Sequence, residues 1–254
     1  MRTRPLRTLA AARDAVRKLH PRAPVTVLVH GGVYALDEPL TFAAADSGSS
    51  EAPITYAAAP NETPILSGGR RITGWQRGKD GNWTASVPQV REGHWYFHQL
   101  WVNGQRRRRA RTPNEGYFTV EGEISFDAQS KFKFHERDIH PEWAGQGVEV
   151  ISLLKWQYLR SPIAAVDEAA RTVTLAGRRP QSGTERDPRY WIENSLDALD
   201  APGEWYLDRK SGTLSYRPLP GEEMNTVETV APHLEQLVRF DGAHHMGRAS
   251  SSAT

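Results

Sequence analysis

The sequence of 254 residues contains no cysteine, which excludes disulfide bonds, thiolate nucleophiles, iron–sulfur clusters and cysteine-bound zinc. It contains no apolar run approaching ~18 residues, so we expect no segment to span a membrane. Neither charge dominates, since 32 basic residues stand against 30 acidic ones and the net charge is +2. Nucleotide-binding, α/β-hydrolase and zinc-protease motifs are missing too. We therefore expect no cofactor and no metal.

One helix is predicted near the N-terminus. Apolar residues recur there at helical spacing and form a single stripe: Leu9, Ala12, Val16 and Leu19. Thr8 can cap the first turn, and Pro21 ends the pattern. A short helix with one apolar stripe is expected to pack against a larger element.

Short strand candidates follow this helix in the sequence, and several begin with proline. They are residues 25–29, 39–42, 53–56 and 64–67, with a further one at 234–240. Val27 and Thr55 lie 28 residues apart, and Leu40 and Ile65 lie 25 apart. Two nearly equal offsets favour successive coils of a solenoid with parallel strands. A plain antiparallel sheet with irregular loops is the alternative.

The middle of the chain has a different pattern. All eight tryptophans lie between Trp75 and Trp205. Asn103 and Gly104 separate two strand-like runs, which is typical of a β-hairpin. Further strands are expected within residues 148–154, 163–175 and 204–216, whereas residues 195–199 could form at most one or two helical turns. Residues ~70–226 are therefore predicted to form an antiparallel, aromatic-rich β domain.

Several segments together resemble a known family. They are TLAAARDAVRKL (8–19), VLVHGGVYALDEPLTF (27–42), DSGSSEAPITYAAAPNETPILSGG (46–69), LWVNGQRRRRARTPNEGYF (100–118) and RYWIENSLDALDAPGEWYLDRKSGTLSYRPLPGE (189–222). They are similar to the N-terminal region of bacterial right-handed parallel β-helix proteins among the carbohydrate-active enzymes. The nearest members are glycoside hydrolases, fucosidase- and xylanase-like, that act on plant cell-wall polysaccharides.

The resemblance implies a mainly β fold: the start of a right-handed parallel β-helix with an N-terminal capping helix and an inserted antiparallel β domain. The implied boundaries are 1–69 for the helix and first coils, 70–226 for the inserted domain, 227–242 for the return strand and 243–254 for a disordered tail. Family members continue for further coils that hold the catalytic carboxylates. No residue here matches those carboxylates, so we expect a truncated form without an assigned catalytic residue.

The function implied is that of the N-terminal portion of a glycoside hydrolase whose partner is a polysaccharide or oligosaccharide. A non-catalytic carbohydrate-binding module and a fragment of a polysaccharide lyase are the alternatives. An extracellular or periplasmic location is expected from the family, although Arg13 and Asp14 interrupt the only stretch that could serve as a signal peptide. An open β-helix edge would allow self-association.

The basic run Arg106–Arg109 has three interpretations. Its guanidinium groups could bind an acidic sugar such as a uronate through bidentate contacts. They could bind nucleic acid, although the nearly neutral chain argues against it. In the third interpretation the run is a strand whose alternate arginines are solvated or packed over aromatic rings.

The segment from residue 111 to 117 is the best candidate for a functional loop. Arg111, Asn114 and Glu115 could reach sugar hydroxyls, and Tyr117 could stack on a pyranose face. With Arg109 from the basic run, these are the predicted substrate-binding residues. The alternative is a structural turn that holds the inserted domain in place.

Other candidates are weaker. One or two of four tryptophans could be exposed sugar platforms: Trp95, Trp101, Trp143 and Trp191. His94 and His98 would lie ~13 Å apart in a strand, too far to share a metal. Glycoside hydrolysis needs two carboxylates at a fixed separation. No pair is evident among the acidic candidates, which are Asp46, Glu115, Glu142, Glu193 and Asp200.

Overall fold

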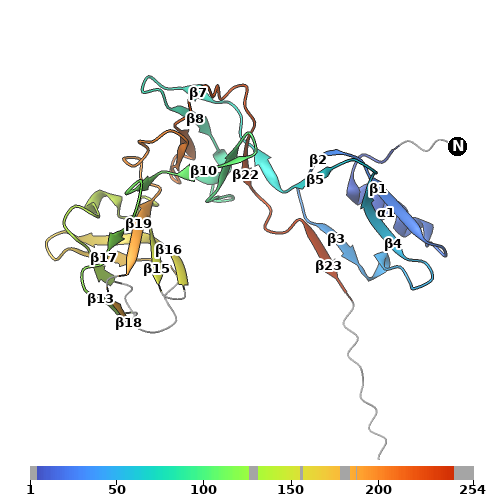
Figure 1. Cartoon of the computed structure of the whole chain (residues 1–254), viewed down its shortest axis with the longest axis horizontal. Coiled ribbons are helices and arrows are strands. Elements are labelled where there is room, and N and C mark those ends of the chain that lie inside the picture. Colours follow the sequence, from blue (N-terminus) through green and yellow to red (C-terminus); the bar gives the residue numbers. More distant parts are fainter. Residues whose placement is uncertain (1–4, 126–130, 155–156, 178–183, 187, 243–254) are drawn as a thin grey trace, which may run out of the picture. The chain divides into compact units, whose positions relative to one another are not determined.

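The structure is a computed structural model, and it describes residues 5–125, 131–154, 157–177, 184–186 and 188–242. The chain divides into two compact units (Figure 1). Unit 1 comprises Met1–Arg70 and Pro232–Thr254, and unit 2 comprises Arg71–Ala231. The predicted disordered tail, 243–254, lies outside the described residues. Among the described residues, no helix is long and apolar enough to cross a membrane.

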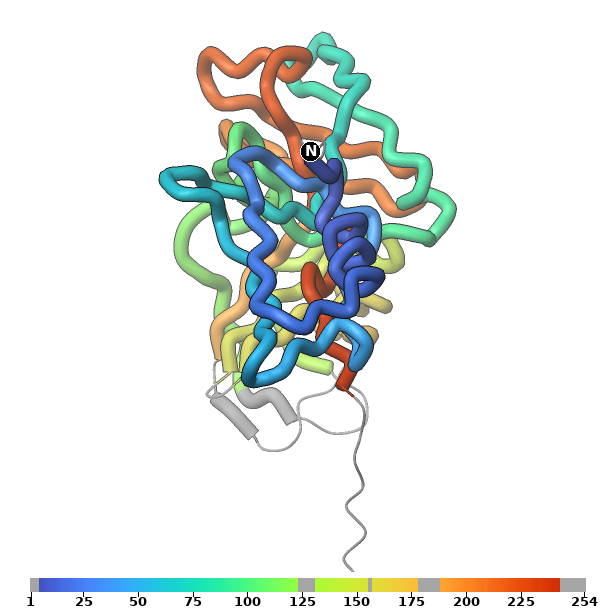
Figure 2. The backbone as a smooth tube through the Cα atoms, turned by 90° about the vertical axis from the view of Figure 1, so that its right-hand side faces the viewer, coloured from blue at the N-terminus to red at the C-terminus, as the bar shows by residue number. Residues whose placement is uncertain are grey.

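Unit 1 contains the predicted helix, α1 (Leu9–Leu19). The Thr8 side chain accepts a hydrogen bond from the Ala11 amide at 3.1 Å and caps the first turn, as expected from the sequence. Leu9 and Val16 of α1 are buried. The helix contacts strands β1 (Val25–Val29) and β3 (Leu40–Ala43), which are drawn with it in shades of blue in Figure 2. Leu19 is 70% exposed, so the buried stripe ends one turn earlier than predicted.

The strands of unit 1 pair in parallel, two at a time. β1 pairs with β4 (Ile54–Ala58), β2 (Gly32–Ala35) with β5 (Pro64–Ser67), and β3 with β23 (Val238–Asp241). The 3₁₀ turn η1 (Ala44–Asp46) follows β3. The predicted strand positions are therefore largely confirmed.

The predicted right-handed parallel β-helix is wrong, because the described parallel strands of unit 1 form three separate two-stranded sheets. Val27 pairs with Tyr56, one position from the predicted Thr55, but Leu40 pairs with Val238 and not with Ile65. Equal spacing misled the prediction, since it identifies strands but not partners. A partner also depends on the path of the intervening chain, which sequence spacing does not reveal.

Unit 2 is built on two larger sheets. The first has the order β6-β22-β9-β10-β20-β21-β8-β7 and is curled. Its strands are β6 (Gly69–Arg71), β7 (Gln76–Arg77), β8 (Trp83–Ser86), β9 (Leu100–Val102), β10 (Gln105–Arg109), β20 (Glu204–Leu207), β21 (Thr213–Tyr216) and β22 (Thr229–Pro232). The predicted antiparallel domain is corrected to a mixed one, because β10 and β20 run parallel. Trp205, Tyr216 and Leu100 lie in its core.

The second sheet of unit 2 has the order β11-β19-β15-β16-β17-β14 and is antiparallel, with β12 also paired to β19. Its strands are β11 (Arg111–Thr112), β12 (Phe118–Thr119), β14 (Lys131–Lys133), β15 (Glu149–Leu154), β16 (Gln157–Asp167), β17 (Thr172–Leu175) and β19 (Arg189–Glu193). A separate pair joins β13 (Glu123–Ser125) to β18 (Thr184–Arg186). The short helices are α2 (Pro88–Arg91) and η2 (Pro141–Trp143).

Local sequence signals in unit 2 are mostly confirmed. Asn103 and Gly104 both adopt positive φ, at 50° and 70°, and connect β9 to β10 as the predicted two-residue hairpin. The expected strands at 148–154, 163–175 and 204–216 are present as β15, the end of β16, β17, β20 and β21. Residues 195–199 form turns and no helix.

One extended segment joins the two sheets. β10 of the first sheet ends at Arg109 and β11 of the second begins at Arg111. The single residue between them, Ala110, is fully buried. Its backbone N–H donates to the Trp205 carbonyl at 2.8 Å, and its carbonyl accepts from the backbone N–H of Asn194 at 2.9 Å. The arginine run therefore continues from one sheet directly into the other.

The Asn194 side chain holds this junction together. It is fully buried at the end of β19, and its amide group exchanges two hydrogen bonds of 3.0 Å with the backbone of Leu207 in β20. It also donates to the Gly147 carbonyl and accepts from Arg109, both at 3.2 Å. A backbone φ of 63° suits asparagine better than most residues.

We predict that Asn194→Ala lowers the free energy of unfolding of unit 2 by about 3 kcal/mol, because it leaves buried backbone groups without partners. Urea denaturation followed by tryptophan fluorescence measures this, since all eight tryptophans lie in unit 2. The exposed Asn225→Ala serves as the control and should change the midpoint little. Equal effects of the two substitutions would contradict the role assigned to Asn194.

Candidate functional site

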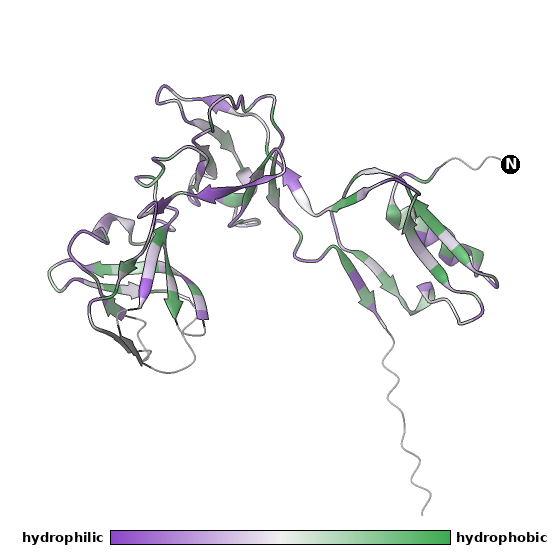
Figure 3. Cartoon of the chain, viewed as in Figure 1, coloured by the Kyte–Doolittle hydropathy of each residue, from purple (hydrophilic) through white to green (hydrophobic). Residues whose placement is uncertain are grey.

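A pocket of about 370 Å³ opens in unit 2 beside the junction of β10 and β11, within the usual range for small-ligand sites. Strand β10 is among the hydrophilic strands drawn purple in Figure 3. The lining is strongly cationic and partly aromatic: His98, Arg106, Arg107, Arg108, Arg109, Arg111, Tyr158, Arg160, Trp191 and Glu193. These residues come from both sheets of unit 2, so the junction brings them together.

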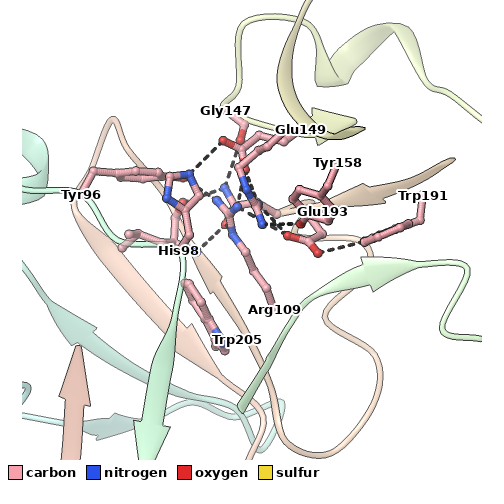
Figure 4. A network of polar contacts seen from close by, with 12 residues as sticks. Tyr96, His98, Arg109, Gly147, Glu149, Tyr158, Trp191, Glu193 and Trp205 are labelled. Carbon is pink, nitrogen blue, oxygen red and sulfur yellow. Dashed lines mark hydrogen bonds and ion pairs between the residues drawn. The ribbon is translucent and has the colours of Figure 1, made fainter. Parts of the chain in front are cut away.

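The carboxylate of Glu149 is the anchor of the polar network at this pocket (Figure 4). Its side chain is 5% exposed, and its Oε2 accepts hydrogen bonds from Nη1 of Arg109 and, at 2.8 Å, from Nη1 of Arg160. Its Oε1 lies 3.3 Å from Nε2 of His98. Arg109 and His98 belong to the side of the first sheet, whereas Glu149 and Arg160 belong to the second. The network therefore crosses between the sheets.

Glu149 is ionised throughout the neutral range. Burial by itself would raise the pKa of its carboxyl group, but the hydrogen bond to His98 and the charges of Arg109 and Arg160 outweigh burial and lower the pKa to about 2. Burial also opposes the charge of Arg160, yet Glu193 and Glu149 together raise the pKa of its guanidinium above the ordinary value. The buried charges thus stabilise one another.

Glu193 is the second carboxylate of the network. It lies directly opposite Glu149 on the neighbouring strands β19 and β15, an arrangement in which like charges repel. Nη1 of Arg160 donates to Glu193 at 2.7 Å as well as to Glu149, and Nη1 of Arg109 lies 3.8 Å from Glu193. The Trp191 indole N–H donates to the other oxygen of Glu193 at 2.8 Å. The two arginines compensate the repulsion between the carboxylates.

Arg111 lies at the rim of the pocket, outside the ion-pair network around Glu149. Its Nε donates to the Pro113 carbonyl at 2.9 Å and its Nη2 to the Gly116 carbonyl at 2.8 Å. Its guanidinium lies over the Trp191 ring at 4.8 Å from the centroid. Burial and the nearby charge of Arg108 lower the pKa of Arg111. Across the described parts of the chain, no carboxylate lies within ion-pair distance of it.

An aromatic surface borders the same rim. The Trp191 ring lies 5.7 Å from the Tyr117 ring and 6.0 Å from the Tyr158 ring, measured between centroids. Tyr117 is 46% exposed and Tyr158 is 54% exposed. The Tyr158 hydroxyl accepts a hydrogen bond from Arg160 at 3.1 Å, which ties this ring to the charged network.

The structure separates the five predicted substrate-binding residues into two groups. Arg109 and Arg111 line the pocket, and Tyr117 packs on Trp191 beside it. Asn114 is half-buried; its side chain donates to Asp200 at 2.7 Å, and its carbonyl accepts from Arg108 at 2.9 Å. Glu115 is exposed and does not line the pocket. The segment 111–117 is therefore held by hydrogen bonds within the protein, and part of it also borders the pocket.

Sequence reasoning missed the centre of the network. Glu149, Arg160, Tyr158 and His98 were not singled out as binding residues. The available signal was the single charged residue, a glutamate, in the mostly apolar run 148–154, where a buried charge requires a partner. His94 and His98 were expected in a strand but lie in an irregular segment before β9. Among the described residues, no group of three potential metal ligands occurs.

The four candidate tryptophans differ in position. Trp95 and Trp143 are buried in the cores of unit 2, and Trp101 is half-buried on β9. Trp191 is 9% exposed and lines the pocket. Of the four, it is therefore the one placed to contact a ligand there.

A larger hollow, of about 710 Å³, lies in unit 1 and is mainly apolar. Its two carboxylates are already paired, Asp46 with Arg17 at 2.6 Å and Asp241 with Arg239 at 2.7 Å. Ligand pockets need a few polar groups that orient the ligand. The pocket of unit 2 offers such groups and is the better candidate site.

Comparisons with known proteins gave a structural match but no sequence family. No family model matches the chain, and no curated protein matches it. A solved structure titled "Glycoside hydrolase" is 25% identical and superposes with a TM-score of 0.80 over 96% of this chain and 45% of that one. A second, titled "The complex structure of XylC with xylose", is 15% identical over 94% of this chain and 30% of that one, with a TM-score of 0.40. The chain spans less than half of either structure.

The depressed pKa of Glu149 predicts a pH-dependent contribution to stability. Its ionised form is favoured by folding, so the stabilisation is complete above about pH 4.5, the ordinary pKa, and is lost as the pH falls towards about 2. We predict that Glu149→Gln lowers the free energy of unfolding of unit 2 at pH 7 by about 3 kcal/mol. The difference from the unsubstituted protein should shrink towards pH 2.

Urea titrations across this pH range, read by tryptophan fluorescence, measure the effect. The exposed Glu223→Gln is the matched control and should follow the unsubstituted protein at every pH. A difference for Glu149→Gln that stays constant between pH 7 and pH 2 would show that the ionised carboxylate is not the stabilising group.

Proposed function

We propose that this chain is a sugar-contacting part of a glycoside hydrolase and that it binds a poly- or oligosaccharide of plant cell-wall type at the pocket of unit 2. The observation that carries the proposal is the superposition on the structure titled "Glycoside hydrolase", at 25% identity over 96% of this chain. Because the chain spans 45% of that structure, the activity of the whole enzyme is itself part of the proposal.

The chemistry of the pocket supports a sugar ligand. A pyranose presents an apolar face and a rim of hydroxyls, so it pairs well with an exposed aromatic ring flanked by hydrogen-bond donors. Tyr158 and Tyr117 offer such rings beside Trp191, and the arginines of β10 and β11 supply donors.

The buried carboxylate beside this pocket, Glu149, is not suited to be the general acid of hydrolysis. A glycosidase needs a general acid with a raised pKa beside a nucleophile or base. Glu149 has its pKa lowered to about 2, and both of its oxygens are engaged by His98, Arg109 and Arg160. It cannot donate a proton to the leaving-group oxygen of the sugar. We therefore propose that the pocket binds and positions sugar, and that the residues of bond cleavage lie elsewhere.

A non-catalytic carbohydrate-binding module is the second candidate, favoured by the same engagement of Glu149. Both functions require that the pocket binds sugar. They differ in whether that sugar is the substrate being cleaved. Consider substitutions that disrupt the pocket in a catalytically active glycoside hydrolase that contains this chain. If the pocket positions the substrate, they change both substrate affinity and turnover. If the chain is a non-catalytic binding module, the same substitutions leave the turnover of short soluble substrates unchanged.

We predict that the chain binds oligosaccharides from xylan or pectin and that Tyr158→Ala weakens the tightest of these interactions about five- to tenfold, through loss of ring contact. Isothermal titration calorimetry measures this. Leu196→Ala is the matched control, since Leu196 is 58% exposed in unit 2 and does not line the pocket. Failure of the folded chain to bind any oligosaccharide of the panel would contradict the proposed function.

A further inference from the structure

The pocket has more cations than its carboxylates can neutralise. Six arginines line it. Arg109 and Arg160 are held by Glu149 and Glu193, and Arg107 is held by Glu222 together with the Tyr216 hydroxyl. The other three are Arg106, Arg108 and Arg111, and within the described ranges none has a carboxylate at ion-pair distance. Three positive charges thus lie at one small concavity, and among the described residues no carboxylate forms an ion pair with them.

Arg111 is the most constrained of the three. It is half-buried, and the carbonyls of Pro113 and Gly116 fix two of its nitrogens, Nε and Nη2. A half-buried cation beside another cation is electrostatically unfavourable, and a bound anion relieves that cost. Because its guanidinium plane is already oriented, little conformational entropy is lost when a planar anion binds.

We propose that the pocket selects a carboxylated sugar, a uronic acid residue, whose carboxylate binds Arg111 with Arg106 and Arg108 and whose ring packs beside Tyr158 and Trp191. This inference rests on the proposed function, because it specifies which class of sugar the same pocket takes. It assigns the specificity for an acidic sugar to the arginines that no protein carboxylate engages.

The rest of the pocket favours a uronate over a nucleic acid or a free phosphate. The chain has a net charge of only +2, whereas proteins that bind a phosphate backbone usually have an extended basic surface. The aromatic border offers nothing to a bare phosphate but fits the face of a sugar ring. A single planar carboxylate matches the guanidinium fork in the way that bidentate pairs require.

The test compares trigalacturonate with its methyl ester, which has the same sugars but no charge, by isothermal titration calorimetry on the full chain. We expect the acid to bind at least about tenfold more tightly than the ester and to weaken as salt is added. We expect Arg111→Gln to remove this preference and Arg111→Lys to restore only part of it. The exposed Arg77→Gln, on β7, is the matched control and should retain it.

Since Arg111 also binds its own loop, Arg106→Gln is the second variant. Arg106 is exposed, so its removal should spare the fold and still reduce the preference for the acid severalfold. Equal binding of acid and ester, with both weakened by Tyr158→Ala, would overturn the uronate inference and leave sugar binding standing. Displacement of trigalacturonate by an equal concentration of inorganic phosphate would also overturn it. Binding of neither acid nor ester, nor of any neutral oligosaccharide, would overturn the proposed function as well.

Discussion

The arrangement of unit 2 depends on a single buried carboxylate shared by two guanidinium groups. Glu149 comes from the second sheet and accepts hydrogen bonds from Arg109 of the first sheet and Arg160 of its own. Removing a carboxylate from water is costly, and the cost is recovered only when cations surround it in good geometry. The network therefore fixes how the strands meet at Ala110, where the chain passes from β10 to β11.

This structural role determines what the pocket can do. Because Glu149 is held as an anion, it does not provide the proton donor that glycosidic cleavage needs, and the arginines without ion-pair partners are the groups that we propose bind the ligand. The aromatic rings at the rim, Trp191 and Tyr158, complete a surface with one apolar side and one cationic side. Such a surface fits the acidic sugar that we propose as its ligand. The similarity to a structure titled "Glycoside hydrolase" agrees with a carbohydrate-related role.

Features set by neighbouring residues could be predicted from the sequence. The helix capped by Thr8 and the hairpin at Asn103 and Gly104 depend on local backbone preferences, and both are present. The parallel pairing in unit 1 depends on contacts between distant segments, such as Leu40 with Val238. Spacing alone suggested a regular solenoid there, whereas the described residues form three separate strand pairs.

The candidate site was predictable only in part, for the same reason. The run from Arg106 to Arg109 is conspicuous in the sequence, and it does line the pocket. Its partners Glu149 and Arg160 are 40 and 51 residues further along than Arg109; Glu149 lies in a run expected to be a buried strand, and Arg160 lies outside the strands expected from the sequence. Only the pairing of β15 with β16 brings Glu149 and Arg160 close together, where Glu149 lies opposite Pro162. The sequence indicated the cations but not the anion that organises them.

A crystal structure of the chain bound to trigalacturonate tests the account most directly. The account predicts one sugar carboxylate within about 3 Å of the Arg111 guanidinium, a sugar ring beside Tyr158, and Glu149 still bound by Arg109 and Arg160. A ligand seated outside this pocket, or a Glu149 side chain turned away from both arginines, would contradict it.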